Sequence, residues 1–137
     1  MTLLQPIDTT QEPPVPQFSS AEIQAMQRAV LNLATRWGLT DEQLAVLLGD
    51  ISVRSLQRWK KGQMGRVGVD TATRLSNLLG IHKALRLLFK DAARGYGWIK
   101  RPNAHFGGKP ALEIMLGGQI TDLMRVRRYL DAARAPW

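Results

Sequence analysis

The sequence predicts an all-α protein, in which an N-terminal bundle of short helices is followed by a second, smaller helical domain. Apolar residues recur at helical spacing along most of the chain, and no run alternates with a period of two over a useful length. We therefore expect no β-sheet. Capping residues and glycine stops divide the pattern into about seven helices. The 137 residues suffice for one compact domain or two small ones that share a core.

The N-terminal helices have clear start and stop signals. Residues 1–18 contain four prolines and predict a disordered or extended arm, or alternatively an arm exchanged with a second subunit. A capping box of Ser19 with Glu22 begins the first helix, and Gly38 ends it. A second box, Thr40 with Gln43, begins the next helix.

The third helix follows Ser52 and ends at Gly62. We expect Asp70 to cap a fourth helix that ends at Gly80, and a fifth helix to run over about residues 81–93.

Glycine and proline dominate the next segment, which predicts turns around Gly95, Gly97, Pro102, Gly107 and Gly108. A short helix beginning at Pro110 and a last helix over about residues 121–134, with Ala133 facing inward, complete the chain. The predicted organisation is thus an arm at 1–18, a helical domain at 19–93 and a second domain at 94–137.

Positive charge is concentrated in the middle of the chain. Nineteen Lys and Arg against eleven Asp and Glu give a net charge of +8, which favours an anionic partner such as nucleic acid. Most of the charged residues in 1–50 are acidic, whereas every charged residue in 51–69 is positive. Such an abrupt change indicates a binding site.

Several functional classes are disfavoured by composition. The chain has no cysteine, which excludes disulfides and thiolate chemistry, and His82 and His105 lack the spacing of metal ligands. We expect no metal and no cofactor. No nucleophile–base or carboxylate pair is suggested, so an enzyme is the weakest hypothesis, with His105 the one residue to test. With no secretory signal and no membrane-spanning stretch, we expect no membrane association and a cytoplasmic location.

Residues 40–62 have the pattern of a helix-turn-helix motif. Ala45 is small where two helices cross closely, and Gly49 supplies the positive φ that the turn requires. Val53, Leu56 and Trp59 lie three apart and are expected to pack inward. The alternative is a helical hairpin whose basic face is merely solvated.

The outward residues of the third helix are the candidate DNA contacts. We expect Arg54, Gln57 and Arg58 to reach base edges, since Arg pairs with guanine and Gln with adenine. Ser55 belongs to the same outward, polar set that suits a major groove. Contacts to phosphate are assigned to Ser52, Lys60, Lys61 and Arg66. The turn is one residue longer than usual, which leaves the matching of side chains to bases open. One such module binds weakly, so we expect a dimer on a two-fold site of double-stranded operator DNA.

The second half of the chain resembles the Xre/MbcA/ParS antitoxin family. The matching residues run in order from Trp98 through 101–103, 106–108, Pro110, Leu112, 117–118 and 128–131, with Trp37, 47–49, 59–60 and Arg74 upstream. Ala111 departs from the pattern, because family members often have a proline there. The resemblance covers residues 36–137.

This resemblance implies that residues 94–137 form a small helical toxin-binding domain. The implied partner is a RES-type toxin, an ADP-ribosyltransferase-like enzyme that consumes NAD or modifies targets with it. The antitoxin would cover the entrance to the toxin's active site and repress the operon that encodes both proteins. A homodimer or a higher hetero-oligomer with the toxin is expected.

Large aromatic residues and cations are the candidate toxin contacts, because such residues dominate interface energetics. They are Trp98, Arg101, Asn103, Phe106, Lys109, Arg125, Arg128, Tyr129, Arg134 and Trp137. Trp98 and Tyr129 could equally belong to the core, and Asn103 could brace its own loop. The rival hypothesis is a stand-alone transcriptional regulator whose C-terminal domain dimerises or senses a small molecule.

Overall fold

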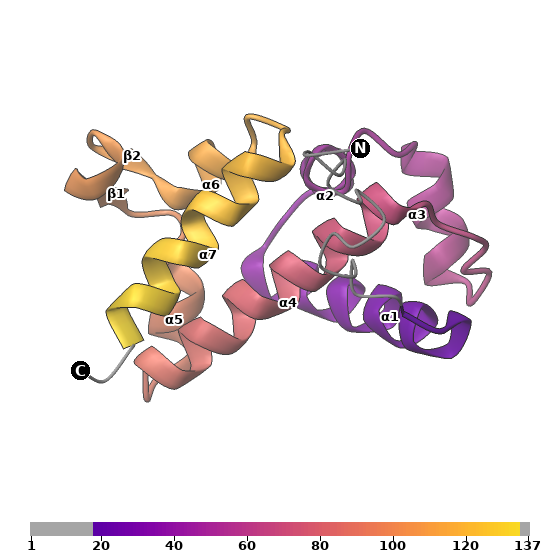
Figure 1. The fold of residues 1–137 in the computed structure, drawn as a ribbon, viewed down its shortest axis with the longest axis horizontal. Coiled ribbons are helices and arrows are strands. Elements are labelled where there is room, and N and C mark those ends of the chain that lie inside the picture. Colours follow the sequence, from indigo (N-terminus) through magenta and orange to yellow (C-terminus); the bar gives the residue numbers. More distant parts are fainter. Residues whose placement is uncertain (1–17, 135–137) are drawn as a thin grey trace, which may run out of the picture.

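The computed structural model describes residues 18–134 and has the predicted all-α architecture (Figure 1). The expected arm at 1–18 and the tail beyond Arg134 lie outside the described residues, apart from Phe18. Within the described range the α-helices are α1 (Ser20–Trp37), α2 (Asp41–Leu47), α3 (Val53–Lys60), α4 (Val69–Leu88), α5 (Ala92–Trp98), α6 (Ala111–Met115) and α7 (Ile120–Arg134). Between α5 and α6 lie β1 (Pro102–Asn103), the 3-10 helix η2 (Ala104–Phe106) and β2 (Lys109–Pro110).

Both predicted capping boxes are confirmed. The Ser19 hydroxyl accepts a hydrogen bond from the Glu22 amide, and the Glu22 carboxylate accepts one from the Ser19 amide. Thr40 and Gln43 make the same reciprocal pair at the start of α2. These bonds satisfy amides that a helix leaves free at its first turn, so the sequence fixes where α1 and α2 begin.

The predicted stop at Gly80 is wrong, because α4 continues unbroken through it to Leu88. A β-carbon at position 80 would lie 2.6 Å from the Arg127 guanidinium, so the glycine allows α7 to approach closely. Arg127 also donates to the Asn77 side chain at 3.3 Å. The predicted Asp70 cap is wrong as well: Gly68 is the N-cap, without a side-chain bond, and Asp70 lies in the first turn.

Three further expectations from glycine-rich sequence and helical spacing are corrected. Gly95 and Gly97 lie inside α5 rather than in turns, and Gly95 is buried where α5 approaches Phe89. A two-stranded antiparallel sheet does form, with Asn103 opposite Lys109, although no sheet was expected. Two residues per strand are too few to produce an alternating pattern. Ala133 is exposed because α7 extends past the core.

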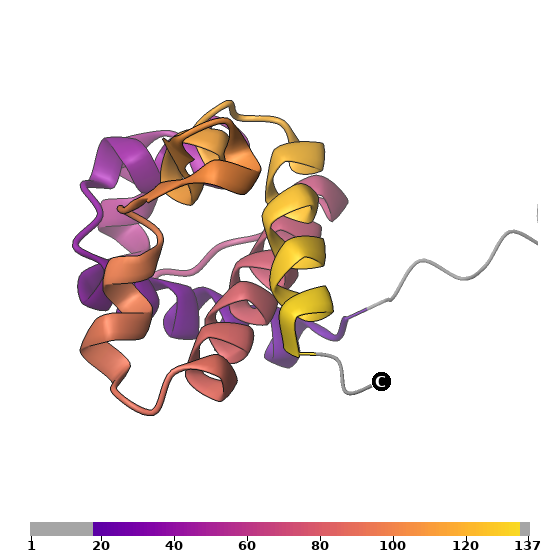
Figure 2. The same cartoon turned by 90° about the vertical axis from the view of Figure 1, so that its left-hand side faces the viewer.

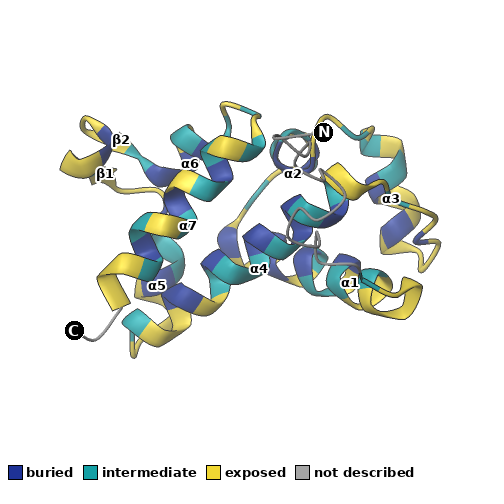
Figure 3. Ribbon diagram, in the orientation of Figure 1, coloured by how far each residue is buried: buried dark blue, intermediate teal, exposed yellow. Residues whose placement is uncertain are grey.

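The core is continuous through both halves of the molecule because α4 serves both. This helix packs against α1 on one side and α7 on the other, and most of its buried apolar residues form one cluster with those of the other helices (Figure 3). Among residues 18–134, no helix is long and apolar enough to cross a membrane, and no three metal-ligating side chains come together.

Candidate nucleic-acid and protein-binding surfaces

The turn between α2 and α3 has the geometry that the sequence predicts. Gly49 has a φ of 91°, and Asp50, unusually for a residue with a side chain, a φ of 64°. The Asp50 amide donates to the Ala45 carbonyl at 2.9 Å, and Ala45 is buried where the helices cross. The Ser52 hydroxyl then caps α3 by accepting from the Ser55 amide. These contacts fix the direction in which α3 leaves the turn.

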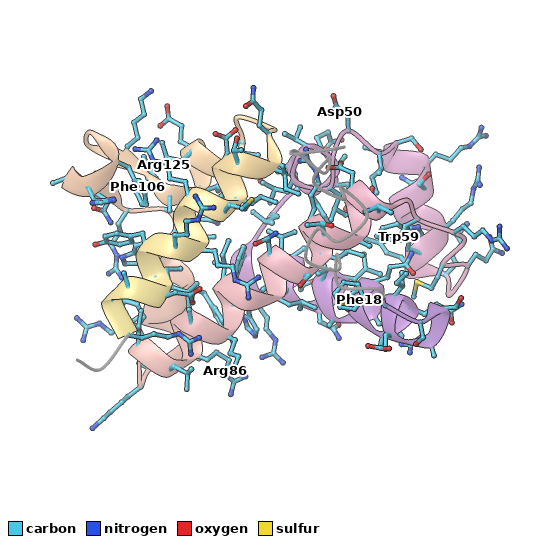
Figure 4. The ribbon with its side chains drawn as sticks, viewed as in Figure 1. Phe18, Asp50, Trp59, Arg86, Phe106 and Arg125 are labelled. Carbon is cyan, nitrogen blue, oxygen red and sulfur yellow. The ribbon has the colours of Figure 1, made fainter. Side chains whose placement is uncertain are left out.

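Helix α3 has one buried face and one exposed basic face. Leu56 and Trp59 are buried and Val53 packs partly against the core, as predicted. Trp59 points back into the molecule (Figure 4). We name four exposed residues that form none of the ion pairs found within residues 18–134 the recognition face: Arg54, Gln57 and Arg58 on α3, and Lys61 at its C-cap.

The other candidate DNA contacts have local partners or lie beside this face. Lys60 forms an ion pair with Asp41 of α2 at 2.6 Å, which ties the two helices together. Ser52 and Ser55 bond each other through their hydroxyls at 2.9 Å. Arg66 is exposed in the loop after α3, and this loop is anchored by the buried Gln27 amide, which donates to the Met64 carbonyl at 2.9 Å.

Replacing Gly49 by alanine is expected to destabilise the protein more than replacing Gly62. Both have positive φ, which costs about 1–2 kcal/mol for a residue with a β-carbon. Only at Gly49 does the new carbon meet neighbours, 2.8 Å from Asp70 Oδ2 and 3.0 Å from Arg74 Nε, whereas Gly62 has open space. We expect an additional loss of at least about 1 kcal/mol for Gly49→Ala. Urea unfolding of both variants measures the difference, and equal losses would contradict it.

Arg74 connects the helix-turn-helix motif to the C-terminal region. Its side chain is almost buried and pairs with Asp70 at 2.9 Å. One terminal nitrogen donates to the Gly118 carbonyl, between α6 and α7, at 2.9 Å, and to the Leu47 carbonyl at the end of α2 at a longer 3.4 Å. One guanidinium therefore holds three segments together. Sequence reasoning found Arg74 only as part of a family pattern, not in this role.

An aromatic stack lies at the other end of the molecule. The Tyr129 ring stacks on Trp98 at 5.9 Å and on His105 at 4.3 Å, measured between ring centroids. Phe106 meets all three rings edge to face, and the Arg125 guanidinium lies 5.3 Å from its centroid (Figure 4). The sequence indicates His105 only as a residue to test for catalysis, because a loop histidine gives no sign of its stacking partner.

Two candidate toxin contacts have structural roles within the fold. Phe106 is only 2% exposed, so the prediction that its ring is a direct toxin contact needs correction: the ring packs edge to face against the three rings of the stack. The Asn103 side chain caps η2 by accepting from the His105 amide at 2.9 Å, as the alternative of a braced loop anticipated. Trp98 and Tyr129 are half-buried and pack against the core.

The candidate cations divide into engaged and unpaired groups. Arg101 donates to the Arg94 carbonyl at 3.0 Å, and Arg134 pairs with Asp131 at 3.4 Å. Lys109, Arg125 and Arg128 are exposed and take part in none of the ion pairs found within residues 18–134. Trp137 lies outside the described residues. The unpaired positive charges are suited to an acidic protein surface.

His82 occupies a junction of three helices. Its ring stacks on Tyr96 of α5 at 5.6 Å, and the Tyr96 hydroxyl accepts from Arg36 of α1 at 3.3 Å. Its Nδ1 atom is buried without a hydrogen-bond partner among the described residues. Burial, followed by the charges of Arg86 and Arg36, lowers the pKa of His82. The structure thus favours the neutral ring.

Acidification is expected to remove the contribution of His82 to stability. Because its pKa is lowered in the fold, this contribution is full above the unfolded value of about 6.5 and is lost as the pH falls below it. Just below that value the unfolded chain binds the proton more readily than the folded chain does, so protonation favours unfolding. Urea unfolding at several pH values from about 7.5 down to about 5 measures the free energy of unfolding on both sides of that value. As the pH falls, this free energy should decline less for His82→Gln than for the parent. Parallel declines would contradict the assignment.

Fold and surfaces together define a helix-turn-helix protein that carries a second helical domain. Residues 24–80 match the antitoxin Xre-like helix-turn-helix domain, and residues 84–135 match the antitoxin Xre/MbcA/ParS C-terminal toxin-binding domain. The chain belongs to the Xre/MbcA/ParS antitoxin family.

Two known proteins extend this comparison. An uncharacterized protein of Sinorhizobium fredii, y4oB, is 43% identical over 119 residues, which cover 87% of this chain and 92% of that protein. A chain in the crystal structure of the M. tuberculosis MbcT-MbcA toxin-antitoxin complex has the same fold, with a TM-score of 0.55 and 24% identity over 78% of this chain and 91% of that one.

Proposed function

We propose that this antitoxin neutralises a RES-type toxin by covering its active site, and that it represses its own operon through the recognition face. The toxin in this proposal is an ADP-ribosyltransferase-like enzyme that consumes NAD. The antitoxin itself supplies no catalytic group and binds no cofactor. It binds operator DNA as a homodimer, or within a larger hetero-oligomer that includes the toxin.

The observation that carries this proposal is the separation of two surfaces along one molecule. The recognition face lies on α3 at one end, and the aromatic stack with its unpaired cations lies beside α7 at the other (Figure 1). DNA and a toxin could therefore be bound at the same time. The RES class of the toxin is supported by the family resemblance of residues 98–131.

Co-purification with the protein encoded beside this chain is the decisive experiment. We expect a stable complex, NAD consumption by the free neighbour, and loss of that consumption when this chain is added. The complex or the chain alone should shift the promoter fragment of the shared operon at low salt. A neighbour that consumes NAD equally with and without this chain would refute neutralisation, and a small molecule that shifts operator binding without a protein partner would favour the stand-alone regulator.

A further inference from the structure

A second concentration of positive charge lies outside the recognition face. Residues 81–109 contain seven basic residues and one acidic residue, against five basic residues in 51–69. That acidic residue, Asp91, is occupied as the N-cap of α5, where it accepts from the Ala93 amide. None of the ion pairs within residues 18–134 involves a residue of this stretch. Uncompensated charge of one sign repels itself in the free protein, which favours a role in attracting an anionic partner.

Helices α1 and α4 both contact α5, and four exposed cations lie on these helices or directly after them. We name them the basic surface: Arg36, Lys83, Arg86 and Lys100.

Two of these cations, Arg36 and Arg86, lie near the stack of His82 on Tyr96. Arg36 reaches it from α1 through the Tyr96 hydroxyl, and the charges of both Arg36 and Arg86 act on His82. The Lys100 ammonium lies beside Gly38, 2.9 Å from where a β-carbon would be, so it too is next to the end of α1. Arg86 projects away from the lower edge of the molecule (Figure 4), and α5 lies next to the C-terminal half of α4 (Figure 2).

The position of this surface separates it from a duplex bound by α3. The recognition helix and α5 lie toward opposite ends of the long axis of the molecule (Figure 1).

Its chemistry also favours a protein partner over nucleic acid. Leu87 is 61% exposed, one of two large apolar side chains with that degree of exposure among the described residues, and it lies one helical turn from Lys83. A phosphate backbone offers no partner for an exposed leucine, whereas an apolar contact rimmed by charge is typical of protein interfaces. Most of residues 81–109 also fall within the toxin-binding domain at 84–135.

We propose that the basic surface docks an acidic patch on the toxin and accelerates formation of the complex. This inference rests on the proposed function, because it assigns a second contact area to the same partner. Arg36 belongs to α1, so the docked toxin would touch the helix-turn-helix domain as well as the toxin-binding domain. The contact area of the toxin would then extend beyond the aromatic stack.

A pair of matched double variants tests the assignment. Lys83→Glu with Arg86→Glu changes the basic surface, and Arg54→Glu with Arg58→Glu applies the same change in net charge to the recognition face; all four side chains are exposed. For each variant, the rate of association with the purified neighbouring toxin is measured at low and high salt, together with binding to promoter DNA. We expect the first pair to slow toxin association about tenfold at low salt, with the difference shrinking at high salt, and to leave DNA binding unchanged. The second pair should have the opposite pattern.

Each other outcome overturns a defined part of the inference. Equal toxin association for the two pairs would refute the basic surface while leaving neutralisation intact. Lost DNA binding with normal toxin association in the first pair would assign the surface to nucleic acid. A parent chain that fails to bind the toxin at all would refute the proposed function and this inference with it. Should the first pair unfold, Lys83→Gln with Arg86→Gln replaces it, with the same pattern at a smaller amplitude.

Discussion

The Arg58→Glu variant is expected to bind operator DNA at least about a hundredfold more weakly than the parent chain. Arg58 is exposed in the middle of the recognition face and takes part in no ion pair within residues 18–134. An arginine that pairs with guanine contributes about 1–3 kcal/mol of discrimination, and a carboxylate in its place is also repelled by the neighbouring phosphates. Titration of a labelled promoter fragment at a fixed salt concentration measures the loss.

A variant at the opposite end of the molecule controls for net charge. Arg128→Glu makes the same change of charge on α7, where the side chain is exposed and unpaired among the described residues. It should bind the operator nearly as well as the parent does. Because Arg58 is exposed, thermal unfolding of its variant should be unchanged within about 0.5 kcal/mol. Normal operator binding by a folded Arg58→Glu protein would show that α3 does not read the DNA.

Arg74→Ala is expected to lower the free energy of unfolding by about 3–5 kcal/mol. The guanidinium donates to the carbonyl oxygens of Gly118 and Leu47 and pairs with Asp70. Asp70 is largely exposed and regains water when the arginine is removed, so most of the loss comes from the two carbonyls left without their donor. Urea unfolding, with the slope of the transition checked for constancy, measures the loss.

A lysine at position 74 distinguishes the contribution of the positive charge from that of the planar guanidinium. Arg74→Lys keeps the positive charge but presents a single ammonium in place of a planar fork, so it cannot reproduce all three contacts. We expect its stability to fall between those of the parent and the alanine variant. Full stability in the alanine variant would mean that Arg74 does not hold the two halves together, and full stability in the lysine variant alone would mean that its charge suffices.

The sequence predicts local structure most accurately where residues close together in the chain determine it. The boxes at Ser19 and Thr40, the positive φ at Gly49 and the inward face of α3 each depend on residues close together in the chain, and the structure confirms them. The last two helices also begin close to where they were expected.

The errors arise where distant contacts determine what a residue does. Gly80 does not end a helix because it accommodates Arg127, which lies almost fifty positions later in the chain. Phe106 is buried and packs edge to face against Trp98 and Tyr129, and His105 gains its stacking partner only from Tyr129. Nor does a window of sequence indicate that Arg74 faces the turn at Gly118. These pairings exist only once the helices have packed.

The unbroken course of α4 also limits how such proteins can be recombined. One helix supplies apolar side chains both to the α1 side and to the α7 side, so a cut at Gly80 would divide the buried residues of α4 between the two fragments. Exchange of partner specificity between relatives must therefore carry α4 across whole, or alter residues on its two faces together. Because the two halves share this helix and one core cluster, we expect them to unfold together as a single cooperative unit.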